Sequence, residues 1–124
     1  MPTQPGLVLV VDDDAAVRAS LKFSLEQEGL TVRAYPDAGA LLEQASLPEK
    51  GCLVVDFYMP AMDGVDLVRS LRRRHVDLPA ILISAKVTPD MRHRAKGAGI
   101  RAVLEKPLED AALLDNIRGA LGRA

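Results

Sequence analysis

The hydrophobic residues of the chain fall into short runs that are separated by longer segments with helical periodicity. Four runs are apolar throughout and too short for a core helix: Leu7 to Val11, Cys52 to Val55, Ala80 to Ile83 and Ala102 to Leu104. Runs of this kind are typical of parallel strands that helices cover on both faces. A fifth segment, Thr31 to Tyr35, alternates between apolar and polar residues, which predicts a half-covered strand at an edge of the sheet.

The segments between these runs carry apolar residues three and four positions apart, which predicts helices. Residues that favour helix N-caps precede three of these segments, at Asp14, Asp37 and Thr88. The predicted helices span residues 14–27, 38–45, 64–74, 89–96 and 108–121. The fourth is nearly all polar, so we expect it to be the least well anchored. In the fifth, the predicted buried stripe is Leu114, Ile117 and Leu121.

Strand and helix patterns alternate five times in 124 residues. Strict alternation with short connections requires parallel strands, right-handed crossovers and helices on both faces of the sheet. With the second strand at an edge, the chain is predicted to form a doubly wound, flavodoxin-like α/β fold of five strands in the order 2-1-3-4-5. No linker divides the sequence, so we predict one domain over residues 1–124. A fold of this class does not by itself indicate a function.

Composition limits the classes of protein to consider. Hydrophobic residues make up 48% of the chain and charged residues 27%, which is typical of a globular protein. The formal net charge of −1 lacks the basic excess that direct nucleic-acid binding would need. No apolar run approaches the roughly 20 residues of a membrane span, and the N-terminus shows no secretion signal. The single cysteine, Cys52, fits a reducing compartment, so we expect a cytoplasmic protein without membrane contact.

Chemically active residues follow four of the predicted strands, at the edge of the sheet where ligands bind in this fold. Asp12 and Asp13 follow the first strand, Asp56 the third, Ser84 the fourth and Lys106 the fifth. Crowded carboxylates repel one another unless a proton or a cation joins them. A purely oxygen ligand set favours Mg²⁺, and an aspartate beside a metal can act as a nucleophile that forms an aspartyl phosphate. The lysine and the serine are suited to contact phosphoryl oxygens, so the residues predict Mg²⁺-dependent phosphorylation of a carboxylate.

The motifs at these positions resemble those of the receiver domain of two-component response regulators. They are Asp12-Asp13, Asp56 followed by Met59-Pro60-x-Met62-Asp63-Gly64, Ser84-Ala85 and Lys106-Pro107. The resemblance extends from about residue 7 to about residue 121. It implies that the chain is a switch module and not an enzyme that turns over an external substrate, since its only chemistry would be to accept its own phosphoryl group and to lose it by hydrolysis.

The resemblance also implies a role for each site residue. Asp56 would be the phosphoacceptor, and Asp13, Asp56 and the backbone carbonyl of Tyr58 would bind Mg²⁺ directly, with Asp12 acting through water. Lys106 would contact the phosphoryl group. In the active state Ser84 and the backbone amide of Ala85 would close on that group.

Partners are implied in the same way. The phosphodonor would be a phosphohistidine on a sensor histidine kinase or a phosphotransfer protein. A downstream effector would bind the surface formed by the fourth helix, the fifth strand and the fifth helix, and a phosphorylation-dependent dimer is compatible with the family. These residues are not expected to bind nucleic acid directly.

Three positions depart from the usual family pattern. Val103 stands where the family commonly has an aromatic residue whose rotamer couples to the serine, and valine has no long side chain to bury or expose. Tyr58 and Lys86 flank the site, and we hypothesise that they shield the acyl phosphate from water. The alternative is that both side chains point to solvent.

Two other functions stay open on the sequence alone. A phosphatase of the haloacid dehalogenase superfamily would use Asp12 as its nucleophile and Asp14 as its general acid and base, although no paired acidic motif follows a late strand. A docking module that never carries phosphate would keep the fold without the chemistry. A phosphoryl label on Asp56 supports the first interpretation and a label on Asp12 the phosphatase. Absence of a Mg²⁺-dependent spectral change on adding beryllofluoride would support the docking module.

Overall fold

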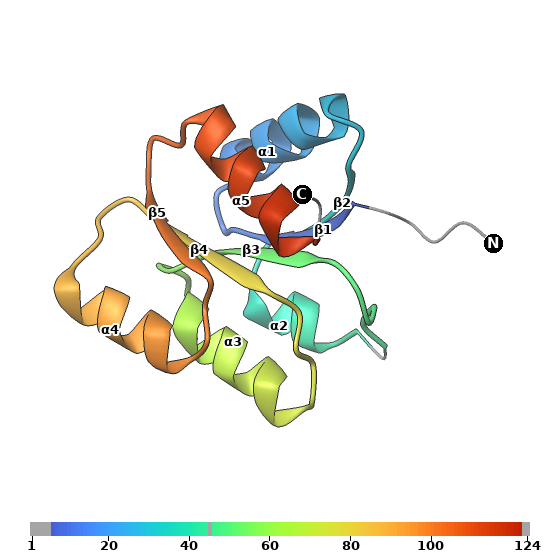
Figure 1. Cartoon of the computed structure of the whole chain (residues 1–124). Helices are drawn as coiled ribbons and strands as arrows, with labels where there is room; N and C mark the ends of the chain where they lie inside the picture. Colours follow the sequence, from blue (N-terminus) through green and yellow to red (C-terminus); the bar gives the residue numbers. More distant parts are fainter. Residues whose placement is uncertain (1–5, 45, 123–124) are drawn as a thin grey trace.

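The computed structural model describes residues 6–44 and 46–122 and forms one parallel five-stranded sheet between two layers of helices (Figure 1). The strands are β1 (Leu7–Val11), β2 (Thr31–Tyr35), β3 (Cys52–Asp56), β4 (Ala80–Ser84) and β5 (Ala102–Glu105). The helices are α1 (Ala15–Gln27), α2 (Ala38–Leu42), α3 (Gly64–Arg73), α4 (Pro89–Gly97) and α5 (Asp110–Ala120). The sheet order is β2-β1-β3-β4-β5, which confirms the predicted topology.

Helices cover both faces of the sheet, with α1 and α5 on one face and α2, α3 and α4 on the other (Figure 1). Side chains alternate between the two faces along each strand. In β1, Leu9 and Val11 belong to the core beneath α2, α3 and α4, whereas Val8 and Val10 belong to the core beneath α1 and α5. The continuous apolar runs in the sequence therefore supply two separate cores at once.

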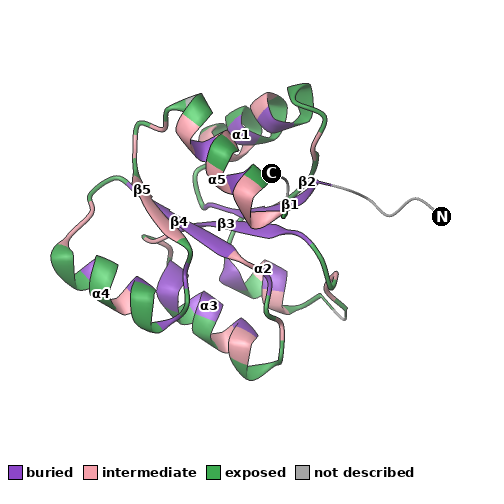
Figure 2. Cartoon of the chain, in the orientation of Figure 1, coloured by how far each residue is buried: buried purple, intermediate pink, exposed green. Residues whose placement is uncertain are grey.

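The last strand is less covered than its apolar sequence predicts. Every described residue of β1, β3 and β4 is buried, but Ala102, Val103 and Leu104 of β5 are half-buried (Figure 2). The reason is the sheet order, which leaves β5 at one edge of the sheet, opposite β2 at the other edge. The prediction that this run is covered on both faces is wrong in that respect.

Three helices start at the predicted N-caps, whereas the end of α2 and the start of α5 differ from the prediction. The side chains of Asp14, Asp37 and Thr88 each accept a hydrogen bond from a backbone amide of the following first turn. The second helix ends at Leu42, because the amide of Gln44 bonds to the carbonyl of Leu41 in a tightened last turn. The remainder of its predicted span reaches residue 45, which lies outside the described residues.

The fifth helix begins at Asp110, two residues later than predicted, and buries a partly different stripe. Leu113 and Ile117, four residues apart, are the side chains buried in the core under α1 and α5. Leu114 instead lies at the boundary with α1 and is half-buried, as is Leu121. The predicted stripe is therefore right at Ile117, whereas Leu114 and Leu121 pack only partly against this core and the other fully buried position is Leu113.

Helix α4 buries two side chains, the same number as α1 and α2, so the expectation that it is the least well anchored helix stays a prediction. Its buried side chains are Met91 and Ala95, whereas α3 buries five residues. None of the helices among the described residues combines the length and the hydropathy that crossing a bilayer requires.

Candidate functional site

Three carboxylates meet at the carboxyl edge of the sheet. The neighbouring strands β1 and β3 end side by side, with Val11 paired to Val55. This register brings together Asp12, Asp13 and Asp56, each of which offers an oxygen within 4.8 Å of the others. Asp12 and Asp56 are buried, with exposed fractions of 0% and 4%, whereas Asp13 is exposed.

Asp12 is held from four directions. Its backbone amide donates to the carbonyl of Tyr35 at 3.2 Å, and its backbone carbonyl accepts from the Arg18 guanidinium at 2.8 Å. Its carboxylate accepts from the backbone amide of Asp14 at 2.9 Å and from Lys106 Nζ at 3.2 Å. Asp12 is therefore a fixed point of the site and not a mobile ligand.

Lys106 is the cation of the site. Its ammonium lies 3.2 Å from a carboxylate oxygen of Asp12 and 3.5 Å from one of Asp56. Burial acts to lower the pKa of Lys106, but the charges of Asp12 and Asp56 outweigh it and raise that pKa above its ordinary value. Lys106 therefore stays charged and faces both acids. The Lys106–Pro107 peptide bond is cis.

Asp56 carries an electrostatic penalty. Burial and, after it, the charge of Asp12 raise the pKa of Asp56 to about 6, against the lowering effect of Lys106. Asp13 adds a further raising contribution. One lysine therefore does not compensate for the negative charge that the three acids would carry at neutral pH.

The donor set fits a hard divalent cation. Carboxylate oxygens are the ligands that Mg²⁺ prefers, and a site with few protein ligands leaves room for waters and a phosphate. Three carboxylates lie within 4.8 Å of one another here, and a divalent cation would offset the repulsion among them. The exposure of Asp13 leaves one side of the cluster open to such an ion.

The loop after Asp56 is shaped by a close backbone approach. A Cβ atom on Gly64 would lie 2.6 Å from the carbonyl oxygen of Asp56 and 2.7 Å from Leu82 Cδ1, so only glycine fits there. The amide of Gly64 also donates to the carbonyl of Phe57 at 3.0 Å. The left-handed backbone of this loop occurs at Ala61, with φ of 70°. Gly64 is thus required for its lack of a side chain and not for its turn conformation.

Ser84 lies at the neighbouring strand end, and its hydroxyl is bonded within its own loop. It donates to the carbonyl of Lys86 at 2.6 Å and accepts from the amide of Lys86 at 3.2 Å. By strand alternation Ser84 follows Leu82 toward the face covered by α3 and α4, whereas Asp56 follows Val54 toward the opposite face. Ser84 therefore lies at the strand end next to that of Asp56, but among the described residues no hydrogen bond joins the Ser84 hydroxyl to the Asp56 carboxylate.

The other residues singled out in the sequence lie around the rim. Ala85 and Lys86 are exposed after β4, and the Tyr58 side chain is 50% exposed. The Tyr58 ring meets the ring of Phe57 edge-on, with 4.8 Å between centroids. Val103 is half-buried and packs against the core beneath α2, α3 and α4.

Two arginines near the site are not evident from the sequence. Arg18 falls on a face of α1 that the sequence pattern assigns to solvent, yet it contacts Asp12. Arg94 of α4 pairs with Asp63 at 3.0 Å and with Asp66 at 3.3 Å, and its guanidinium lies over the ring of Phe57. The Arg94 contact joins residues 31 positions apart that the tertiary fold brings together, whereas Arg18 and Asp12 are six positions apart. The position of Arg18 four residues after a capping aspartate is the one signal that could have indicated it.

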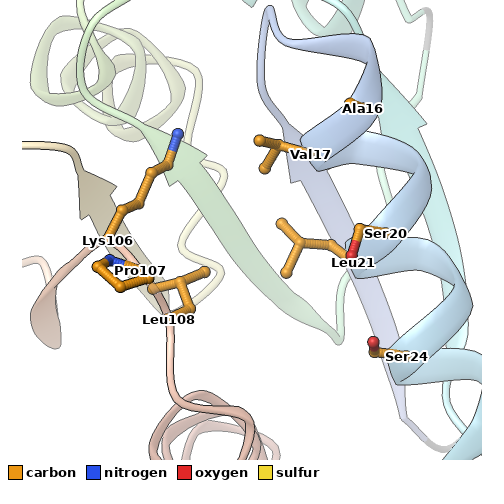
Figure 3. Close-up of a pocket in the computed structure, with 8 residues that line it drawn as sticks. All are labelled: Ala16, Val17, Ser20, Leu21, Ser24, Lys106, Pro107 and Leu108. Carbon is orange, nitrogen blue, oxygen red and sulfur yellow. The ribbon is translucent and has the colours of Figure 1, made fainter.

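A groove opens beside Lys106 on the face of the sheet that α1 covers. It has a volume of about 320 Å³ and lies between α1 and the segment that follows β5. Figure 3 shows the side chains of Val17 and Leu21 pointing across it toward Lys106, Pro107 and Leu108. Its lining is Ala16, Val17, Ser20, Leu21, Ser24, Lys106, Pro107 and Leu108.

Comparison with known proteins gives a consistent result. The family model described as "Response regulator receiver domain" matches residues 8–118. The transcriptional regulatory protein FixJ of Azorhizobium caulinodans is 37% identical over 117 residues, which cover 94% of this chain and 56% of that protein. The C4-dicarboxylate transport transcriptional regulatory protein DctD of Pseudomonas aeruginosa is 38% identical, over 92% of this chain and 25% of its own length. The chain thus spans little more than half the length of one relative and a quarter of the other.

Solved structures agree with this result. The structure described as FixJ-N has a TM-score of 0.88 and 35% identity, and the match covers 98% of each chain. The chemotaxis protein CheY4 of Vibrio cholerae has a TM-score of 0.86 at 24% identity, which supports the fold alone.

Proposed function

The chain belongs to the response regulator receiver domain family, and from that premise we propose that Asp56 is its phosphoacceptor. The observation that carries the proposal is the position of Asp56, buried at a strand end close to two other carboxylates and 3.5 Å from Lys106. A carboxylate so placed is stabilised by a cation that offsets the repulsion, and that cation would also offset the negative charge that a phosphoryl group adds. We also propose that residues 1–124 form a single receiver domain, which the one continuous sheet supports.

The transfer requires little covalent chemistry from the protein. A carboxylate oxygen of Asp56 forms a bond to phosphorus while the bond from phosphorus to the donor nitrogen of a phosphohistidine breaks, and that nitrogen keeps the electron pair. Lys106 then faces the negative charge on the transferred oxygens. Loss of the phosphoryl group to water reverses the state. The domain thus acts on itself and turns over no external substrate.

Asp13, Asp56 and the backbone carbonyl of Tyr58 would hold a Mg²⁺ ion, with Asp12 acting through water. Bound there, the ion would neutralise negative charge on the phosphoryl oxygens. Asp12 contributes by keeping Lys106 oriented, since its carboxylate lies 3.2 Å from the ammonium. Asp13 contributes an exposed carboxylate that is free to accept a metal bond.

The donor would approach from the side of α1. The groove beside Lys106 is the described hollow next to the site, and it is lined by small and apolar side chains of α1. We propose that the phosphohistidine belongs to a sensor histidine kinase or a phosphotransfer protein that contacts this side. Such donors act in the cytoplasm, where we place the domain.

The effector would bind on the side of α4, away from the side of α1 where the donor approaches. Ser84 points toward the layer of α3 and α4, and its hydroxyl now holds the backbone of Lys86 in the segment that leads to α4. If Ser84 and the amide of Ala85 turn to a phosphoryl group on Asp56, those bonds to Lys86 break and the segment is released. A partner, or a second copy of the domain, would then meet an altered surface of α4, β5 and α5.

Treatment with acetyl phosphate in Mg²⁺, followed by mass spectrometry of the peptides, tests the proposal. We expect one phosphoryl group on Asp56, no label in Asp56→Asn, and no label in EDTA. Asp115→Asn, an exposed carboxylate on α5, is the matched control and should label like the wild type. A label on Asp12 would replace the proposal with the phosphatase, and no label at all would favour the docking module.

A further inference from the structure

Arg18 reaches back over the start of its own helix to the acidic loop. Its guanidinium Nη1 donates to the backbone carbonyl oxygen of Asp12 at 2.8 Å, and the side chain is half-buried. We propose that Arg18 is a positioning residue for divalent-cation binding, because it fixes the peptide that precedes Asp13. The inference rests on the proposed function, since it assumes that Asp13 is a metal ligand.

The carbonyl of Asp12 lies where the strand ladder ends. The amide of Asp12 still bonds to Tyr35, the last residue of β2, and beyond that point β2 turns away into the cap of α2. The guanidinium of Arg18 therefore takes the place that a strand amide would have. A hydrogen bond from a charged donor is stronger than one from an amide, so this carbonyl is firmly oriented.

Asp13 depends on its two flanking peptides for its direction. Arg18 holds the peptide before it, and the bond from the Asp14 amide to Asp12 Oδ1, at 2.9 Å, holds the peptide after it. Across residues 6–44 and 46–122, no hydrogen bond or ion pair restrains the Asp13 carboxylate itself. The backbone therefore sets the proximity of Asp13 to Asp12 and Asp56, and Arg18 holds the peptide on the N-terminal side of Asp13.

The effect of Arg18 is one of geometry and not of charge at the acceptor. The groups that set the pKa of Asp56 are its own burial, Asp12, Lys106 and Asp13, and Arg18 is not among them. Arg18 contacts the backbone carbonyl of Asp12, whereas Lys106 contacts the carboxylates of Asp12 and Asp56. Loss of Arg18 should therefore leave the acids in place and loosen the direction of Asp13.

Isothermal titration of the metal-free protein with MgCl₂ tests this role. Removing a group that orients a metal ligand typically weakens metal binding by roughly tenfold or more, and we expect a loss of that size in Arg18→Met. Arg18→Lys keeps a cationic donor and should fall between Arg18→Met and the wild type. Arg118→Met removes an arginine that pairs with Glu28 far from the site, and should bind Mg²⁺ like the wild type.

A double-mutant cycle separates positioning from a general loss of stability. In Asp13→Asn, which lacks the ligand that Arg18 orients, Arg18→Met should weaken Mg²⁺ binding no further. The inference would be overturned if Arg18→Met weakened Mg²⁺ binding in Asp13→Asn by the same factor as in the wild type. It would also be overturned if Arg18→Met bound Mg²⁺ with wild-type affinity. If Arg18→Met does not fold by circular dichroism, wild-type affinity in Arg18→Lys and in Arg18→Gln overturns it equally.

Two further Mg²⁺ titrations complete the test, one at high salt concentration and one of the wild type alone. A through-space charge effect is screened in about 1 M KCl, so the difference between Arg18→Met and the wild type should persist there, and its disappearance would contradict positioning. If the wild type itself binds no Mg²⁺, the proposed function fails; if the wild type binds and Arg18→Met binds equally well, only the role of Arg18 fails.

Discussion

At the scale of single residues, Asp56 is held in an environment that disfavours its charge. Its pKa is raised to about 6 by burial and by Asp12, whereas in the unfolded chain it would titrate near 3.8. Between these two pH values the folded state binds the proton more tightly than the unfolded state does. The free energy of unfolding therefore falls as pH rises through this window, and the penalty is complete above it.

Replacing Asp56 by asparagine should relieve this penalty. In EDTA we expect Asp56→Asn to raise the free energy of unfolding at pH 7 by on the order of 2 kcal/mol and to have little effect at pH 3.5. Urea titrations at several pH values measure the difference. The same substitution at Asp115 controls for the loss of one negative charge, and a gain at Asp56 that does not vary with pH would contradict the explanation.

Gly64 gives a second prediction at this scale. Because an added Cβ would lie 2.6 Å from the carbonyl of Asp56, Gly64→Ala must displace backbone at the acceptor. We expect a loss of about 2 kcal/mol in the free energy of unfolding, together with slower labelling by acetyl phosphate. At Gly97 the nearest atom to an added Cβ is the end of the Arg69 side chain, at 3.4 Å, so Gly97→Ala should be neutral or slightly stabilising.

At the scale of elements, Arg94 adds a polar contact that anchors α4 to α3. The helix buries only Met91 and Ala95 among its own residues, while Arg94 pairs with Asp63 and Asp66 at the start of α3. The hydrogen bond from Arg94 to Asp63 is the main cause that raises the pKa of Arg94, and the charges of Asp63 and Asp66 raise that pKa further. This contact joins α4 to the loop that follows the acceptor strand.

Removing that contact should loosen α4 more than the rest of the protein. For Arg94→Gln we expect a modest loss of about 0.5–1 kcal/mol in the free energy of unfolding. Hydrogen exchange should accelerate in α4 and stay unchanged in α1. Lys22→Gln breaks the exposed pair with Glu26 inside α1 and is the control; equal acceleration of α4 exchange in that variant would argue against the role of Arg94.

The elements also show what the sequence can and cannot predict. Strand positions and sheet order follow from the apolar runs, and the caps at Asp14, Asp37 and Thr88 follow from local chemistry, because these signals act within a few residues. The stripe through Leu113 was missed because periodicity alone does not show which neighbouring helix a side chain meets.

The candidate site divides in the same way. Its acids and lysine are predictable because parallel strands align their carboxyl ends, whatever lies between them in the chain. The contacts of Arg18 with Asp12 and of Arg94 with Asp63 depend on how long side chains cross between elements, and no local pattern encodes that. The orientation of the Ser84 hydroxyl is likewise a property of its folded loop.

At the scale of the whole molecule, the acidic cluster links the two helical layers. Residues that reach the site come from β1, β3 and the end of β5, between a core beneath α1 and α5 and another beneath α2, α3 and α4. A cation bound there should therefore stabilise the entire fold and not one layer of it.

Mg²⁺ should raise the stability of the intact domain. At a hundred times its dissociation constant, a ligand that binds only the folded state adds about 2.7 kcal/mol to the free energy of unfolding. We expect a corresponding rise in the thermal midpoint of the wild type and none in Asp13→Asn with Asp56→Asn combined. KCl at matched ionic strength is the control, and an equal rise in KCl would rule out a specific site.

The burial of Cys52 has a practical consequence for studying this switch. The residue opens the central strand β3 with an exposed fraction of 0%, and its burial raises the pKa of the thiol to about 12. Because maleimide dyes react with thiolates, the native cysteine will stay unlabelled at neutral pH. Cysteines introduced at the exposed Phe23 of α1 and His93 of α4 would then take a fluorophore pair directly. Energy transfer between the two dyes would follow rearrangement across the sheet in real time.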